Sequence, residues 1–202
     1  MLLRFEAKLC IHSRHCVLQA PKVFLANTPG KWLYPDAMPV ERLVEVAHAC
    51  PSGAITYART DGGPEEPVPD VNVLRVRENG PLAVHADIRL GDQVIRRATL
   101  CRCGASQNKP FCDGSHVALG FTATGEPATQ PSEPLAVRGG ALTVVPKANG
   151  PLAISGPLEL CSGTGRTVVR LEGTKLCRCG ASNRKPFCDG THAKIGFTAA
   201  GE

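Results

Sequence analysis

The sequence predicts an α+β fold in which β-rich segments dominate and a small unit with one clear helix precedes them. Three observations lead to this prediction. Only 4% of the 202 residues are aromatic, whereas glycine and proline number 21 and 17, which favours several small, turn-rich units over one large core. A cysteine-containing segment occurs twice along the chain. Two polar stretches that contain proline separate the units.

These two polar stretches are predicted linkers and set the domain boundaries. They read RTDGGPEEPVPD at residues 59–70 and EPATQPSEP at residues 126–134. They divide the chain into an N-terminal unit, residues 1–58, and two repeat units, residues 71–125 and 135–202. Within the N-terminal unit, Val40–His48 has the apolar spacing of a helix, and Pro39 suits its first turn.

Each repeat unit is predicted to be mainly β-strand before its cysteines, because short runs alternate or are rich in β-branched residues. The predicted strands are Val71–Arg77, Leu82–Leu90 and Val94–Leu100 in the first repeat, and Ala141–Val145, Leu152–Leu160 and Thr167–Leu171 in the second. Gly91-Asp92 is typical of a hairpin turn. The second copy carries six extra residues, which we expect in the glycine-containing stretch that begins at Cys161.

The cysteine-rich segments predict a metal site in each repeat. Residues 100–116 read LCRCGASQNKPFCDGSH and residues 176–192 read LCRCGASNRKPFCDGTH. Three thiols and one imidazole therefore recur with the spacing C-x-C-x8-C-x3-H. The donors are Cys101, Cys103, Cys112 and His116, and then Cys177, Cys179, Cys188 and His192. This spacing alone leaves structural zinc open, because three cysteines and a histidine form a common zinc site.

The residues around these donors resemble the CDGSH iron–sulfur, or mitoNEET-like, family. Both copies fit C-x-C-x2-S-x3-P-x-C-D-G-[S/T]-H. The resemblance implies a [2Fe–2S] cluster in each repeat in place of zinc. It implies that Cys101 and Cys103 bind one iron and that Cys112 and His116 bind the other, with Cys177, Cys179, Cys188 and His192 acting likewise. Because family members with one motif pair as homodimers, it also implies a monomeric chain in which two CDGSH domains pack as an intramolecular pseudo-dimer.

One imidazole among three thiolates predicts particular redox properties. Such a site is less negative than one with four thiolates, so its reduction potential should lie above that of four-cysteine ferredoxins. Histidine is also the ligand that takes up a proton near neutral pH. We therefore hypothesise that His116 and His192 are the labile ligands of their clusters.

Other residues shared by both copies are expected to support the donors. They are Ser106 and Ser182, Asp113 and Asp189, and Lys109 and Lys185. The serines are expected to bond to cluster sulfur or to the local backbone, and the aspartates to cap a short helix as its N-cap residues. The lysines are expected to raise the potential through their charge. For each pair, the alternative is an ordinary role in a turn or on the surface.

Three further cysteines predict a third site in the N-terminal unit. Cys10-x5-Cys16 and the later Cys50-Pro-Ser-Gly-Ala resemble a divergent branch of small single-cluster ferredoxins. The resemblance implies a ferredoxin-like fold. The usual pattern has further cysteines near Ser13 and Ala20, and this chain has none there. Three thiolates suit a [3Fe–4S] cluster, and a [4Fe–4S] cluster whose fourth ligand is His12, His15 or a non-protein group is the other option. The alternative is a unit that keeps the fold and holds no cluster.

These sites predict a protein of electron transfer that works with a redox partner protein. The alternative is storage or delivery of [2Fe–2S] clusters to an apo iron–sulfur protein, or redox or pH sensing. The sequence shows no nucleophile–base pair and no nucleotide-binding glycine loop, so we do not expect an enzyme.

Composition indicates which partners and which cellular compartment to expect. The net charge of +5 is spread along the chain without a basic run, which argues against nucleic acid. No apolar run approaches the roughly 20 residues of a membrane span, and the N-terminus does not read as a secretory signal. We therefore expect a cytoplasmic protein whose cysteines bind metal rather than form disulfides. Cys161, His48 and His85 belong to no motif and are expected to be structural or exposed.

Overall fold

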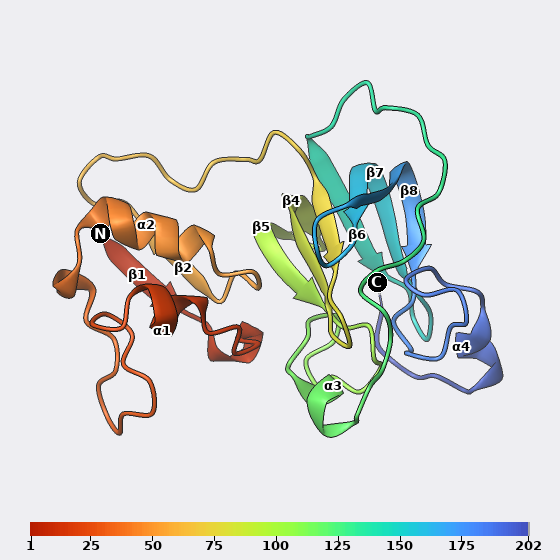
Figure 1. Cartoon of the computed structure of the whole chain (residues 1–202), viewed down its shortest axis with the longest axis horizontal. Coiled ribbons are helices and arrows are strands. Elements are labelled where there is room, and N and C mark those ends of the chain that lie inside the picture. The colour runs from red at the N-terminus through yellow and green to blue at the C-terminus, as the bar shows by residue number, and fades with distance from the viewer. Residues whose placement is uncertain (202) are drawn as a thin grey trace.

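The computed structural model describes residues 1–201, and it is mostly β-strand with a few short helices (Figure 1). The N-terminal unit contains β1 (Leu2–Phe5), α1 (His15–Gln19), α2 (Val40–His48) and β2 (Ile55–Ala58), with 3-10 turns at Ala7–Leu9 and Pro35–Ala37. Strands β1 and β2 pair antiparallel, and α2 packs against β2. The predicted helix has the observed bounds, although Pro39 is its N-cap rather than a residue of its first turn.

The two repeats together build one six-stranded sheet. The first repeat contributes β3 (Val73–Val76), β4 (Leu82–Leu90) and β5 (Gln93–Leu100), and the second contributes β6 (Ala141–Pro146), β7 (Leu152–Cys161) and β8 (Thr167–Leu176). Every predicted run overlaps one strand, although β5, β6, β7 and β8 extend beyond their runs. The largest difference is in β8, which continues past Leu171 because it pairs with β7 as far as Leu176.

The repeats exchange strands in a reciprocal way. Strand β3 pairs parallel with β7 of the other repeat, and β6 pairs parallel with β4. One edge of β4 therefore serves two partners, β3 over Leu82–His85 and β6 over Asp87–Arg89. The register shift after His85 lies where the partner changes, and β7 has its counterpart after Ser155. As a result, buried side chains of both repeats share one apolar cluster.

Asn72 joins the two repeats at this exchange point. Its side chain is fully buried. Its Nδ2 donates to the carbonyl oxygens of Gly140 and Pro157, both at 2.9 Å, and its Oδ1 accepts the Asp87 N–H at 3.3 Å. A buried polar group that is left without a hydrogen-bond partner destabilises the folded state. Asn72 should therefore stabilise the joined sheet.

Replacing Asn72 by alanine should lower the free energy of unfolding by about 2 to 4 kcal/mol, because two carbonyls and one N–H lose a buried partner. Chemical denaturation followed by circular dichroism measures the change. Asn183→Ala is the matched control, because Asn183 is exposed and only its backbone N–H is bonded to Asp189. Equal stabilities of the two variants would contradict the role of Asn72.

The strand register locates the insertion of the second repeat. Leu90 pairs with Gln93 in the first hairpin, whereas Leu160 pairs with Val169 in the second. The extra residues therefore lie between Leu160 and Val169, which confirms the expected place. The stretch at residues 126–134 runs beside β8, where the Gln130 N–H donates to the Val168 carbonyl. No helix among residues 1–201 is long and apolar enough to cross a membrane.

Candidate metal centres

In each repeat, the predicted donors lie together in a loop that follows the last strand, and they form two pairs. In the first repeat, the Sγ atoms of Cys101 and Cys103 are 3.8 Å apart, and Cys112 Sγ lies 3.4 Å from His116 Nδ1. The second repeat reproduces this arrangement. Its separations are 3.8 Å between Cys177 and Cys179 and 3.3 Å between Cys188 and His192.

The spacing within each pair fits two donors on one tetrahedral metal atom. Thiolates bound at about 2.3 Å from such an atom lie about 3.8 Å apart. Within the described part of the chain, no three His, Cys, Asp or Glu side chains converge on one point that suits a single ion. Each of the four pairs has the spacing of two ligands on one metal atom.

Backbone hydrogen bonds return each loop to the strand it follows. The Cys101 N–H donates to the Pro110 carbonyl, and the Cys112 N–H donates to the Thr99 carbonyl, both at 2.8 Å. Inside the loop, Ser106 Oγ donates to the Phe111 carbonyl at 2.6 Å. Ser182 makes the equivalent bond to Phe187 at 2.7 Å. Of the two roles expected for the serines, the structure shows bonding to the local backbone.

Asp113 fastens the loop, but it is not the N-cap residue that we expected. Its carboxylate accepts the Gln107 N–H at 2.7 Å and the Ser115 N–H at 3.0 Å. Gly114 is the N-cap of α3 (Ser115–Ala118), the short helix that carries His116. Its φ of +88° is a left-handed conformation that glycine adopts readily, so the aspartate stands one residue before the cap.

In the second repeat, too, a glycine rather than the aspartate is the N-cap residue. Gly190 is the N-cap of α4 (Thr191–Lys194), and Asp189 accepts the N–H groups of Asn183 and Thr191. The lysines also serve their own loops, because Lys109 Nζ donates to the Ser106 carbonyl and Lys185 Nζ to the Ser182 carbonyl. The repeated polar residues therefore hold the loop shape.

Burial and hydrogen bonding shift the pKa values of Cys101 and Cys112 in the first site in opposite directions. The hydrogen bond from Cys103, together with the backbone N–H groups of Ser106 and Gly104, lowers the pKa of Cys101. Burial raises the pKa of Cys112 to about 11 and lowers the pKa of His116. Both burial effects favour neutral side chains. A bound metal cation is what would stabilise Cys112 as a thiolate.

The two donor loops touch each other across the sheet end. Cys103 and Cys179 form an antiparallel bridge. Gly104 has φ +85°, and a Cβ there would lie only 2.5 Å from the Cys179 carbonyl oxygen. A Cβ at Gly180 would likewise lie too close to the Cys103 carbonyl oxygen. Only glycine fits these positions, so the close approach of the two sites is built into the backbone.

Two buried arginines, which the sequence analysis did not single out, hold the ends of each repeat together. Arg102 and Arg178 are each 1% exposed. Arg102 donates to the carbonyls of Gly80, Thr124, Arg77 and Ala123. Arg178 donates to those of Gly150, Ala200 and Lys147. Burial lowers the pKa of Arg102, and the nearby Cys177 thiol of the other repeat opposes that effect. The sequence does contain a signal for these arginines, because both copies have an arginine between the first two cysteines of the motif.

Arg102→Gln should lower the free energy of unfolding by about 3 to 5 kcal/mol, because buried carbonyls lose a charged donor. Arg102→Lys should fall between this variant and the wild type, because it keeps the charge but cannot reach all four carbonyls. Thermal and chemical unfolding measure both variants. Arg184→Gln is the control at an exposed position of the second loop. A loss in Arg102→Gln no greater than in this control would contradict the assignment.

The N-terminal unit also brings its three cysteines together. Cys10, Cys16 and Cys50 line a cavity of about 590 Å³, together with His12 and His15. Burial raises the pKa of Cys16, and the neighbouring Cys50 and Cys10 add to this effect. Ser13 also lines this cavity, whereas Ala20 is fully buried in the core. Three thiols around one cavity form a donor set that suits an iron–sulfur cluster.

The residues outside these sites have structural positions. All ten cysteines are free thiols. Cys161 is buried at the end of β7, and burial raises its pKa. His48 Nε2 lies 2.9 Å from the Tyr57 hydroxyl, and His85 is exposed on β4.

Comparisons with known proteins agree with this arrangement. Residues 79–117 and 149–193 match the family described as iron-binding zinc finger CDGSH type. Residues 1–60 match the family described as divergent 4Fe-4S mono-cluster. The uncharacterized protein YjdI of Escherichia coli K12 is 41% identical over 54 residues, which is 26% of this chain and 68% of YjdI. YjdI of Escherichia coli O157:H7 matches to the same extent.

The donor loops and these matches define an iron–sulfur protein. More specifically, the chain belongs to the CDGSH family, with two CDGSH domains in tandem behind an N-terminal divergent 4Fe-4S mono-cluster domain.

Proposed function

We propose that the chain holds two [2Fe–2S] clusters, each through three thiolates and one imidazole, and works in electron transfer. The supporting observation is that the four donors of each loop form two pairs, each with the spacing of ligands on one metal atom. In the first repeat, Cys101 and Cys103 would hold one iron, and Cys112 and His116 the other. Such a cluster accepts and donates single electrons when bound.

The protein's own residues give the first site a closed side and an open side. In the first site the three cysteines are at most 9% exposed, whereas His116 is half-buried. Phe111 packs against the apolar cluster of the sheet. The thiol side is thereby kept from water, and the imidazole side is the one that a redox partner protein can approach.

The reciprocal pairing of β3 with β7 and of β6 with β4 supports an intramolecular pseudo-dimer. Each repeat supplies the strand that covers an edge of the other, and the two donor loops meet at Cys103 and Cys179. We therefore propose that one chain supplies both halves and acts as a monomer. If a protease site is introduced into residues 126–134, the cleaved halves should stay associated, and their separation into stable monomers would refute the proposal.

A third cluster in the N-terminal unit, of the [3Fe–4S] or [4Fe–4S] type, completes the proposal. It is supported by the cavity that Cys10, Cys16 and Cys50 line. His12 and His15 line the same cavity and are candidates for a fourth ligand.

Anaerobic purification, with iron and sulfide counts and electron paramagnetic resonance, tests the whole proposal. After reduction with dithionite, two [2Fe–2S] signals with one further cluster are expected, and iron and sulfide should be equal or nearly equal in amount. Colourless protein that contains zinc would refute the proposed cofactors. A fragment of residues 1–60 that stays free of iron after reconstitution would refute the third cluster alone.

His116→Cys should lower the reduction potential of the first-repeat cluster by on the order of 100 to 300 mV, because a thiolate adds one negative charge to the site. His192→Cys should do the same for the second cluster, so the two variants are controls for each other. Protein-film voltammetry measures the potentials, and paramagnetic resonance identifies the altered cluster. Unchanged potentials in fully loaded variants would contradict ligation by these histidines.

Cluster storage and delivery, or redox or pH sensing, is the second candidate function. It is favoured by the position of His116, which is half-buried beside three buried thiols. Mixing the loaded protein with an apo-ferredoxin distinguishes the candidates. Rapid, reversible reduction without loss of iron supports electron transfer, whereas growth of the ferredoxin spectrum at the expense of this protein supports delivery.

A further inference from the structure

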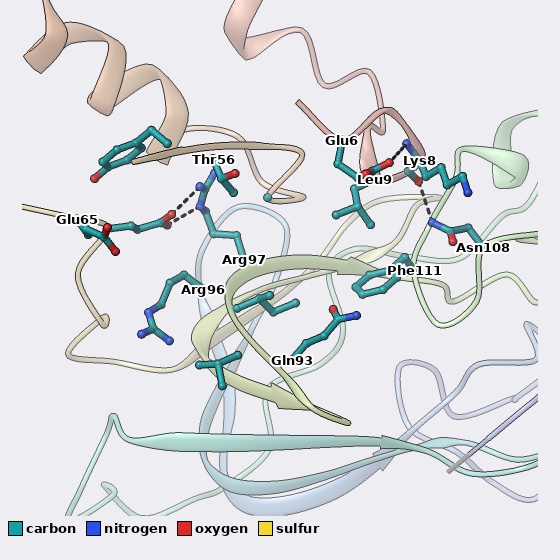
Figure 2. Close-up of a pocket in the computed structure, with 15 residues that line it drawn as sticks. Glu6, Lys8, Leu9, Thr56, Glu65, Gln93, Arg96, Arg97, Asn108 and Phe111 are labelled. Carbon is teal, nitrogen blue, oxygen red and sulfur yellow. Dashed lines mark hydrogen bonds and ion pairs between the residues drawn. The ribbon is translucent and has the colours of Figure 1, made fainter. Parts of the chain in front are cut away.

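The N-terminal unit lies against the first repeat, and a cavity of about 620 Å³ separates parts of their surfaces (Figure 2). The unit is on the β5 side of the sheet, away from β8 (Figure 1). Lys8, Leu9 and Tyr57 line the cavity from the N-terminal side, and Arg97, Asn108 and Phe111 line it from the first repeat. This contact places the N-terminal unit against the first repeat.

Arg97 of β5 is the main polar link across this contact. It is 5% exposed. Its Nη1 donates to the Cys50 carbonyl at 2.6 Å and also to the Ala47 carbonyl, and its Nη2 donates to the Ile55 carbonyl at 3.0 Å. Its Nε and Nη2 bind both carboxylate oxygens of Glu66, at 2.6 and 2.8 Å. A buried guanidinium is favourable only with such partners, and here most of them belong to the N-terminal unit.

Two more contacts reinforce the link. Gly53 has φ +69°, and a Cβ there would lie 2.6 Å from the Arg97 carbonyl oxygen, so the two backbones approach as closely as glycine allows. Asn108 Nδ2 donates to the Lys8 carbonyl at 2.9 Å, as Figure 2 shows. Leu9 and Phe111 line the shared cavity and immediately precede the proposed ligands Cys10 and Cys112.

The second repeat lacks both polar groups. Arg97 pairs with His85 in β4, and the equivalent pair in the second repeat is Gly173 with Ser155. Asn108 is replaced by Arg184, which occupies the same position after the loop serine. The two repeats share their donors but differ where the N-terminal unit binds.

We propose that Arg97, assisted by Gly53 and Asn108, is a positioning residue that holds the N-terminal unit on the first repeat alone. The inference rests on the proposed function. It implies that the N-terminal site exchanges electrons with the first-repeat site and reaches the second only through the first. In that exchange one electron leaves the N-terminal site, which is oxidised, and reduces the first-repeat site, with no bond formed or broken. An external one-electron reductant supplies the electron.

The test compares the loaded wild-type chain with Arg97→Gly and Asn108→Arg, which introduce the residues of the second repeat, and with the control Arg184→Asn. Amide hydrogen exchange over residues 47–56 reports the contact and should accelerate by about tenfold or more in Arg97→Gly. With all clusters reduced by dithionite, the spin relaxation of each [2Fe–2S] signal reports its nearness to the paramagnetic N-terminal cluster. The His116→Cys and His192→Cys variants assign the two signals.

In the wild type and in Arg184→Asn, the first-repeat signal should relax faster than the second, and Arg97→Gly should remove this difference. Asn108→Arg should reduce it. Gly53→Ala keeps the buried charge and should also weaken the contact, so it serves if Arg97→Gly does not load its clusters. Equal relaxation of the two signals in the fully loaded wild type overturns the inference. So does unchanged exchange and relaxation in fully loaded Arg97→Gly.

Failure of the proposed function is distinguishable from failure of this inference. A wild-type chain that holds no third cluster overturns both the N-terminal site and the electron route, whatever the exchange data show. A chain that holds all three clusters but shows no difference between the two repeat signals overturns this inference, including the electron route, and leaves the proposed clusters in place.

Discussion

The structure depends on the sharing of strand edges between the two repeats. One edge of β4 and one edge of β7 each have two partners, and one partner in each case comes from the other repeat. A repeat on its own would leave these N–H and C=O groups, and the apolar face beneath them, without partners. The donor loops follow β5 and β8, so the same pairing that covers the edges also brings Cys103 beside Cys179. The closeness of the two proposed cluster sites is thus a consequence of how the sheet is completed.

Buried arginines hold other segments of the chain together by donating hydrogen bonds to backbone carbonyls. Arg102 and Arg178 bind the turns and the C-terminal segment of their own repeats, while Arg97 binds the carbonyls of the N-terminal unit. Each guanidinium would be costly to bury alone, because its desolvation must be offset by well-placed acceptors. Among residues 1–201, every buried side-chain nitrogen and oxygen has a hydrogen-bond partner. The chain therefore joins its segments through buried polar contacts. Replacing one of these arginines would leave its carbonyl partners without a hydrogen bond.

The sequence predicts the features that depend on local pattern. The helix over Val40–His48, the strand positions of both repeats and the grouping of donors in two equivalent loops follow from periodicity and from the duplication. Features that depend on distant partners do not. Asp113 looks like an N-cap because the left-handed conformation of Gly114 is invisible in the local pattern. Arg97 looks like an ordinary strand residue, because the carbonyls that bury it belong to residues more than 40 positions earlier in the chain. The short strands β1 and β2 likewise pair across the whole N-terminal unit.

Two sites with identical donors are not equivalent when their surroundings differ. The first-repeat thiols of Cys103 and Cys112 are buried, whereas Cys179 and Cys188 of the second repeat are half-buried. The N-terminal unit lies against the first repeat, where Arg97 and Asn108 occupy the positions that Gly173 and Arg184 occupy in the second repeat. Ligand type should give both proposed clusters similar intrinsic potentials, so a difference between their potentials must come from burial and charge around each site. On the proposed route, the covered first site receives electrons within the chain, and the more open second site is the one that an external partner can reach.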